Sequence, residues 1–170
     1  SLICCRKHLN KPFIFSTVDT LYPEDCPEPI TNWMGVSKIE DPVNFCTVEL
    51  KSNKKLIKAL IDKSKNGSNL AFIGVAGIND HKTFFENLLN DNTQIDGEIQ
   101  VSNGFKGLIK KGLKPLNFYW FDIGNLDGYY LANKYFSTNV FEFDFSKKDE
   151  YIYFVNNIVI KYFSESKIVN

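Results

Sequence analysis

Two aspartates that directly follow apolar runs are the first residues in this sequence that could do chemistry. Asp19 comes after Phe13–Val18, and Asp122 comes after the run FYWF at 118–121. Ligands of open α/β sheets bind at the carboxyl ends of strands. Two carboxylates that converge there could hold Mg²⁺, which takes one or two carboxylates and completes its shell with water and phosphate oxygens. Each aspartate could instead cap the turn or helix that follows it, which is the commoner role for a single Asp.

Three further residues stand where a ligand could contact the chain. Lys63 follows an apolar run and could contact a phosphate as a point charge, although a solvated surface lysine is the commoner case. Glu98 follows a glycine and is either an acid in the first turn of a helix or a ligand contact. Gly74 and Gly77 lie within the apolar run Leu70–Ile78 and indicate close approach by another backbone or a ligand.

Strands and helices are predicted to alternate through most of the chain. β-branched and aromatic runs predict the strands, and helical periodicity with capping residues predicts the helices. Residues 56–63 are ambiguous, but the turn residues before them favour a hairpin strand. The alternation predicts an α/β layered domain. Strands are expected at residues 13–18, 36–39, 45–50, 70–78 and 116–121, and helices at 1–10, 81–90, 98–111 and from 127 or 128 onward.

The C-terminal region is predicted to be a β-hairpin. Its two strands, Tyr151–Val155 and Ile158–Phe163, are joined by two asparagines, which tolerate the positive φ of a type I′ turn. We therefore predict two regions: an α/β domain at residues 1–138 and a hairpin region at residues 139–170.

Composition argues against several classes of protein. The chain has 20 basic and 20 acidic residues, and Arg6 is its only arginine. A nucleic-acid binder usually has a basic patch, so we expect no nucleic-acid partner. No apolar run approaches the ~18–20 residues of a membrane span. The four cysteines form no CxxC pair, so we expect no zinc site and reduced thiols in a cytoplasmic protein.

The order of several short motifs resembles that of a known family. The similarity is to the nucleotidyltransferases that make nucleotide sugars, the nucleoside-diphosphate-sugar pyrophosphorylases. This resemblance implies a Rossmann-like α/β sheet with flanking helices. It also implies that an NTP and a sugar 1-phosphate, or a related phospho-alcohol, react to give an NDP-sugar and pyrophosphate. The motifs are VDTLY (18–22), LIDK (60–63), FIGVAGI (72–78), GEIQVSNGF (97–105) and WFDIGNLDGYYLANKYF (120–136).

The resemblance also implies roles for single residues. Asp19 and Asp122 match the two aspartates that hold the catalytic Mg²⁺ in this family. Lys63 matches the lysine of the family's glutamate-lysine-proline motif, which contacts the sugar phosphate. Gly74 and Glu98 match positions near the sugar. This set suits the reaction, because an anionic phosphate attacks the α-phosphorus in line and needs charge neutralisation and positioning more than a general base.

Several positions depart from the family pattern. Val18 stands where the family usually has glycine, Asp62 and Ser64 replace the residues on either side of the motif lysine, and Asn125 stands where threonine is common. These differences bear on substrate identity. The family opens with a glycine-rich, arginine-containing loop that binds the nucleotide, and none precedes Lys11 here. We therefore expect that a preceding segment is missing and that these 170 residues alone show little or no turnover.

Other interpretations of the sequence stay open. A nucleotide-sugar-dependent glycosyltransferase would have a similar sheet and metal-binding aspartates, but it would release a nucleoside diphosphate instead of pyrophosphate. A non-catalytic remnant would keep the fold without turnover. The tail resembles the opening of a phosphotransferase domain that follows such transferases in capsule and surface-polysaccharide proteins, and a plain hairpin is the alternative. The sequence leaves the nucleotide, the sugar and the oligomeric state open.

Overall fold

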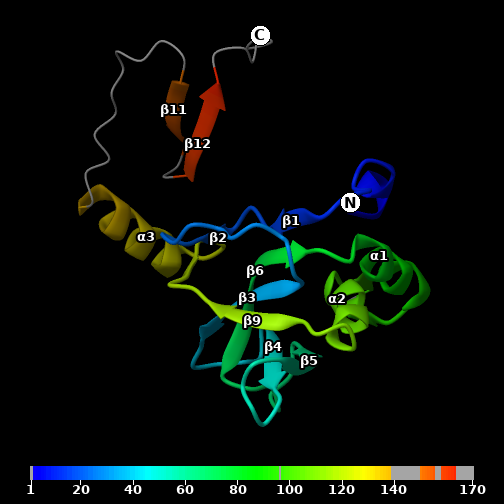
Figure 1. The fold of residues 1–170 in the computed structure, drawn as a ribbon. Helices are drawn as coiled ribbons and strands as arrows, with labels where there is room; N and C mark the ends of the chain where they lie inside the picture. The colour runs from blue at the N-terminus through cyan, green and yellow to red at the C-terminus, as the bar shows by residue number, and fades with distance from the viewer. Residues whose placement is uncertain (1, 96, 139–149, 156–157, 164–170) are drawn as a thin grey trace. The chain divides into compact units, whose positions relative to one another are not determined.

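A mixed β-sheet forms the centre of residues 1–120. The computed structural model describes residues 2–95, 97–138, 150–155 and 158–163. The strands of the sheet are β1 (Phe13–Ser16), β3 (Trp33–Lys38), β4 (Cys46–Leu50), β5 (Ile57–Asp62), β6 (Leu70–Ile78) and β9 (Lys114–Asn117). Their order is β5-β4-β6-β3-β9, with β1 paired to β6 beside this path (Figure 1). Within this sheet β3 and β9 are parallel, and the other pairs are antiparallel.

The sequence of β6 explains its central place. All its residues from Ala71 to Ile78 are buried. A strand with neighbours on both edges and cover on both faces needs such a continuous apolar run. The structure confirms the predicted strand at 70–78, and it also confirms the hairpin of β4 and β5, in which Thr47 pairs with Ile61.

Two helices, α1 (His81–Asn90) and α2 (Ser102–Ile109), lie side by side next to the sheet (Figure 1). The core between them is aromatic, and the ring centroids of Phe84 and Phe105 are 5.0 Å apart. The helices approach closely because α2 has Gly104 at the contact, where a Cβ would lie 2.6 Å from the Phe84 ring. Burying each large apolar side chain here stabilises the fold by about 2 kcal/mol.

The N-terminus of α1 is tied to the sheet by side-chain hydrogen bonds. Asp80 is the N-cap, and its Oδ1 accepts from the Thr83 N–H at 3.1 Å. The buried Asn32, just before β3, accepts from the N–H groups of Asn79 and Asp80 at 2.9 Å each. These bonds satisfy donors that the helix itself cannot pair. The structure confirms the predicted helix at 81–90 and its cap, and a 3₁₀ helix (Leu2–Lys7) confirms the helical start of the chain.

Residues 121–170 form a second compact unit. Its C-terminal strands make an antiparallel hairpin in which Val155 pairs with Ile158, which confirms the predicted strands. The turn at 156–157 lies outside the described residues, and the predicted division between residues 138 and 139 stays a prediction. No helix in the described part of the chain is long and apolar enough to span a membrane. The elements are β10 (Phe121–Asp122), α3 (Leu126–Thr138), β11 (Glu150–Val155) and β12 (Ile158–Phe163).

The helix expected over residues 98–111 begins later than predicted, at Ser102. Gly97, with φ of +80°, lies instead between two short antiparallel strands, β7 (Gln94–Ile95) and β8 (Glu98–Ile99). The interpretation of Glu98 as a first-turn helix acid is therefore wrong, because this residue lies in β8.

The strand expected over residues 116–121 is also interrupted. The ladder to β3 ends at Asn117; the Phe118 N–H still donates to the carbonyl of Val36 at 3.1 Å, but Tyr119 bonds to a loop instead. The Tyr119 N–H donates to Glu24 Oε1 at 2.7 Å, and the Trp120 ring packs edge-on against Phe45 with centroids 5.5 Å apart. These contacts are tertiary, so strand propensity alone could not show the interruption.

Candidate functional site

The edge of β6 that faces away from β3 is shared by two strands that meet in its middle. β1 pairs with residues 75–78 of β6, and β4 pairs with β6 through Ala71. Between them lie residues 72–74, which include Gly74, and Figure 1 shows β1 and β4 toward opposite ends of β6. One strand therefore leaves this edge where the other begins. We call this break in pairing the switch point of the sheet; a glycine within such a strand often marks close approach by a ligand or another backbone.

Gly74 makes this break in the sheet possible. Its φ is +87°, and a Cβ here would overlap the side chain of Thr17. The Thr17 N–H donates to the Gly74 carbonyl at 2.9 Å, after which the chain leaves the sheet. The predicted close approach is thus confirmed, and the group that approaches Gly74 is Thr17. The expectation that Gly74 lies near the sugar stays a prediction.

Asp19 follows this point of departure, in an exposed turn before the short strand β2 (Thr20–Leu21). Its neighbour Val18 is 90% exposed. Just beyond the turn, Tyr22 packs against Phe118, with ring centroids 5.1 Å apart. Burial and the neighbouring Cys26 raise the pKa of Tyr22 to about 12, so this side chain is a neutral, fixed support for the turn at ordinary pH.

Lys63 lies on the other side of the break, directly after β5. Its N–H donates to the carbonyl of Phe45 at 2.9 Å, at the start of β4. Its φ is +41°, which is a left-handed conformation that costs a side-chain-bearing residue about 1–3 kcal/mol. Such strain persists only where surrounding contacts impose it, and it gathers at functional sites. The structure thus places Asp19, Gly74 and Lys63 around one switch point.

Glu98 is exposed on β8, where it pairs with Ile95. The amide of Gln100 bonds the carbonyls of Ile95 and Glu98 at 3.4 and 3.3 Å, which braces this small hairpin. The segment leads into α2, whose first residue, Ser102, bonds the end of β5. The hairpin that carries Glu98 is therefore connected to the strand that precedes Lys63.

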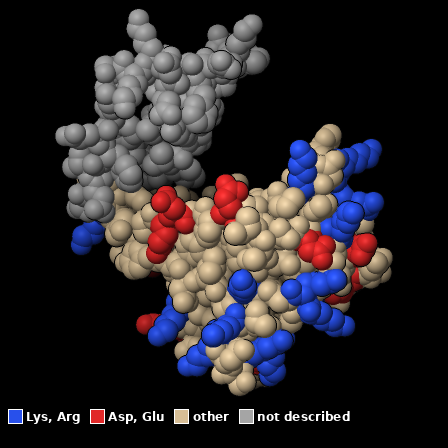
Figure 2. Space-filling model, viewed as in Figure 1, with Lys and Arg blue, Asp and Glu red and all other residues tan. Residues whose placement is uncertain are grey.

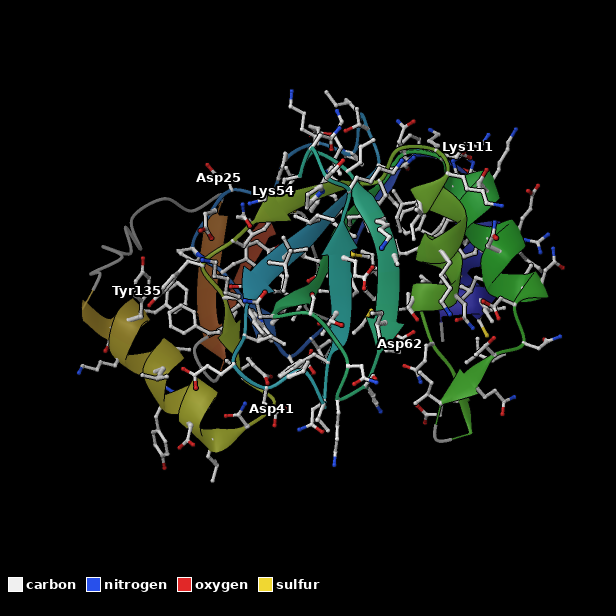
Figure 3. All side chains as sticks on the ribbon, turned by 90° about the horizontal axis from the view of Figure 1, so that it is seen from below. Asp25, Asp41, Lys54, Asp62, Lys111 and Tyr135 are labelled. Carbon is white, nitrogen blue, oxygen red and sulfur yellow. The ribbon has the colours of Figure 1, made fainter. Side chains whose placement is uncertain are left out.

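Asp62 and Ser102 belong to the site region, although neither was predicted from the sequence as a site residue. Asp62 Oδ2 accepts from Ser102 Oγ at 2.9 Å, and Figure 3 shows Asp62 at the end of β5 beside α2. Burial raises the pKa of the neighbouring Cys46, and the Asp62 charge raises it further. The sequence held only a weak sign of this contact. Asp62 lies in the motif LIDK and Ser102 in the motif GEIQVSNGF, but the two residues are 40 positions apart.

Asp122 belongs to the second unit, where it precedes α3. Its Oδ1 accepts from the Gly124 N–H at 3.1 Å, and its Oδ2 accepts from Asn125 Nδ2 at 3.0 Å. Asn125 caps α3, because its Oδ1 accepts from the Gly128 N–H at 2.9 Å. The alternative for Asp122 is therefore confirmed for the turn, which its carboxylate caps, and wrong for the helix, which Asn125 caps. The helix begins at Leu126, slightly earlier than the predicted start at 127 or 128.

The two predicted metal aspartates suit a hard cation by their chemistry. Each carboxylate oxygen of Asp122 accepts one hydrogen bond from its own turn and keeps a second acceptor direction. Asp19 is exposed, as a carboxylate that shares Mg²⁺ with water and phosphate must be. Among the residues that the structure describes, no three His, Cys, Asp or Glu side chains cluster. The convergence of Asp19 and Asp122 on one ion stays a prediction.

Lysines are unevenly spread over the first unit. Figure 2 shows Lys and Arg side chains over the part of the molecule that holds β4 and β5, and also over the part that holds the N-terminus, α1 and α2. The hairpin turn and the strand after it carry exposed Lys51, Lys54, Lys55 and Lys58. A local excess of positive charge attracts anionic molecules even when the net charge is zero.

No protein-family model matches the chain. The chain is 30% identical over 152 residues to the bifunctional protein GlmU of Methanococcus vannielii, which covers 82% of the chain. It is 24% identical over 166 residues to the GlmU protein of Methanococcus maripaludis, which covers 95% of the chain. The chain spans 36% of the first relative and 40% of the second.

Solved structures share the fold. A UDP-glucose pyrophosphorylase complexed with UDP-glucose matches with a TM-score of 0.68 and 17% identity, over 82% of this chain and 61% of that one. A UTP-bound UGPase from Acinetobacter baumannii matches with a TM-score of 0.63 and 15% identity, over 83% of this chain and 56% of that one. These matches confirm the predicted Rossmann-like α/β sheet with flanking helices.

Proposed function

Because the chain belongs to the sugar-nucleotide nucleotidyltransferase family, we propose that it takes part in nucleotidyl transfer from an NTP to a sugar 1-phosphate or a related phospho-alcohol. The products are an NDP-sugar and pyrophosphate. The observation that carries this proposal is the switch point in the sheet, where Asp19 and Lys63 flank the break at Gly74. The relatives' similarity supports the reaction class.

In the proposed mechanism the chain binds and orients two anionic substrates. The Lys63 ammonium contacts the phosphate of the sugar and offsets its charge as that phosphate approaches the α-phosphorus. Asp19 and Asp122 would hold Mg²⁺, which supplies charge neutralisation on the NTP phosphates. The attacking phosphate is already anionic, so no side chain has to remove a proton. Gly74 and Glu98 lie near the sugar in this proposal.

The cellular purpose is a further part of the proposal. We assign the NDP-sugar to surface-polysaccharide synthesis, supported by the resemblance of the tail to phosphotransferase domains fused behind such transferases. A cytoplasmic location agrees with the four free cysteines, since reduced thiols are usual there.

Product analysis tests the reaction class. A longer protein that contains these 170 residues, which alone are expected to show little or no turnover, is incubated with an NTP, a sugar 1-phosphate and Mg²⁺, and pyrophosphate is measured. We expect pyrophosphate and an NDP-sugar. Release of a nucleoside diphosphate from an NDP-sugar donor would favour a glycosyltransferase, and no turnover with any pair would favour a non-catalytic domain.

Substitution of Lys63 tests its role in the same assay. Lys63→Ala is expected to lower kcat/KM for the sugar 1-phosphate about ten- to hundredfold, because a charge-assisted contact is lost. The matched control is Lys58→Ala on the same hairpin, where the exposed Lys58 pairs with Glu49 at 2.9 Å and little change is expected. Equal effects of the two substitutions would contradict the assignment of Lys63.

A further inference from the structure

A hydrogen-bonded cluster joins the end of β5 to the start of α2. Ser102 Oγ donates to Asp62 Oδ2 at 2.9 Å, and Lys106 Nζ lies 3.9 Å from the same oxygen. Both partners of the hydrogen bond are protected, since Ser102 is 2% exposed and the Asp62 side chain 11%. A charge-assisted hydrogen bond between protected groups holds more firmly than a surface ion pair.

The cluster extends to the segment between the two helices. Lys106 Nζ donates to Asn103 Oδ1 at 2.9 Å and lies 3.7 Å from Asp91 Oδ2. Asn103 is 1% exposed, and its amide donates to the carbonyls of Asp91 and Thr93 at 3.2 and 2.9 Å. The start of α2 is therefore fixed to the beginning of the segment that carries Glu98.

At the other end of the cluster, Asp62 directly precedes Lys63, the residue with the strained backbone. Asp62 pairs with Cys46 across the β4–β5 ladder, and the next residue, Lys63, bonds Phe45 with a φ of +41°. Adjacent Cα atoms are about 3.8 Å apart, so a side chain that fixes Asp62 also fixes where Lys63 departs from the strand. Left-handed backbone at a lysine requires such surrounding contacts.

We infer that Asp62 is a positioning residue: its carboxylate, held by Ser102 and Lys106, fixes Lys63 relative to the hairpin that carries Glu98. This inference rests on the proposed function, in which Lys63 contacts the sugar phosphate. The cluster touches no group assigned to the nucleotide. Its loss therefore acts on the sugar phosphate and spares the NTP.

Steady-state kinetics of Ser102→Ala test the inference. The expected result is a KM for the sugar 1-phosphate raised about tenfold, while the KM for the NTP stays within about twofold. The matched control is Glu49→Gln, which removes a carboxylate from the same hairpin, where Glu49 forms an exposed pair with Lys58. Equal increases in both KM values, or the same increase in the control, would overturn the inference.

Hydrogen–deuterium exchange separates this inference from the proposed function. In Ser102→Ala, the amide of Lys63 and those of residues 97–101 are expected to exchange about fivefold faster or more, with the amides of β6 as internal reference. Absence of nucleotidyl transfer in the unsubstituted protein would refute the proposed function, and the exchange experiment would still test the cluster. Unchanged exchange at Lys63 and residues 97–101 would overturn the role of Asp62.

Discussion

At the scale of single residues, the site is marked by unusual backbone conformations. Gly74 and Lys63 both have positive φ, of +87° and +41°, and both lie at the switch point of the sheet. The glycine accepts this conformation without cost, whereas the lysine is held in it by its neighbours. The sequence indicated the importance of Gly74 through its place in an apolar strand. It contained no sign of the conformation of Lys63.

Gly74→Ala is predicted to lower the free energy of unfolding by about 2 kcal/mol or more. The new methyl group meets positive φ and the Thr17 side chain together, with Thr17 Cγ2 3.1 Å from the Cβ position. Chemical denaturation measures the change.

The matched control for this prediction is Gly97→Ala, because Gly97 has φ of +80° and, apart from its chain neighbours, no heavy atom of the described residues lies within 4 Å of its Cβ position. This substitution therefore lowers the free energy of unfolding only by the cost of a positive φ for alanine, about 1 kcal/mol. Equal losses for the two substitutions would show that contact with Thr17 contributes nothing.

At the scale of elements, the sequence predicted those strands and helices whose bounds are determined by local residue patterns. The apolar run of β6 and the amphipathic pattern of α1 determine both elements, and the predicted bounds agree with the structure. The start of α2 could not be predicted, because a turn at Gly97 and a short hairpin replace the first expected turns. The bond between Asp62 and Ser102 was equally hidden, since spacing along the chain does not show which distant side chains meet.

The N-cap of α1 is predicted to make stability depend on pH. Burial acts to raise the pKa of Asp80, but hydrogen bonds from Thr83, together with the charges of Lys111 and His81, outweigh it and lower the pKa below its usual range. A carboxyl group whose pKa is lower in the folded state stabilises the protein at pH values above its unfolded-state pKa of about 3.9. This stabilisation is lost as the pH falls through the folded-state pKa.

Asp80→Ala should lower the unfolding free energy by about 1 kcal/mol at pH 7. Asp80→Asn keeps an acceptor and cannot titrate, so it serves as the control. Urea unfolding from pH 7 down to pH 2 should show the unsubstituted protein losing stability below pH about 4 relative to Asp80→Asn. A difference that stays constant over this range would contradict the proposed origin of the pKa shift.

At the scale of the whole molecule, the chain consists of two units, residues 1–120 and 121–170. The first contains the switch point with Asp19, Gly74 and Lys63, and the second contains Asp122 in a turn fixed by its own hydrogen bonds. Net charge is zero, yet the β4–β5 hairpin is rich in lysine. A neutral protein can therefore still offer a positive surface to phosphorylated substrates.

Pyrophosphate release by Asp122→Asn is the direct test of whether Asp122 holds the Mg²⁺ that nucleotidyl transfer requires. An asparagine at this position still accepts the hydrogen bond from the Gly124 N–H but lacks the negative charge that binds Mg²⁺. The rate of pyrophosphate release is therefore predicted to fall about hundredfold or more. The control is Asp127→Asn, an exposed acid in the first turn of α3, for which no loss is expected. Undiminished pyrophosphate release by Asp122→Asn would contradict the account.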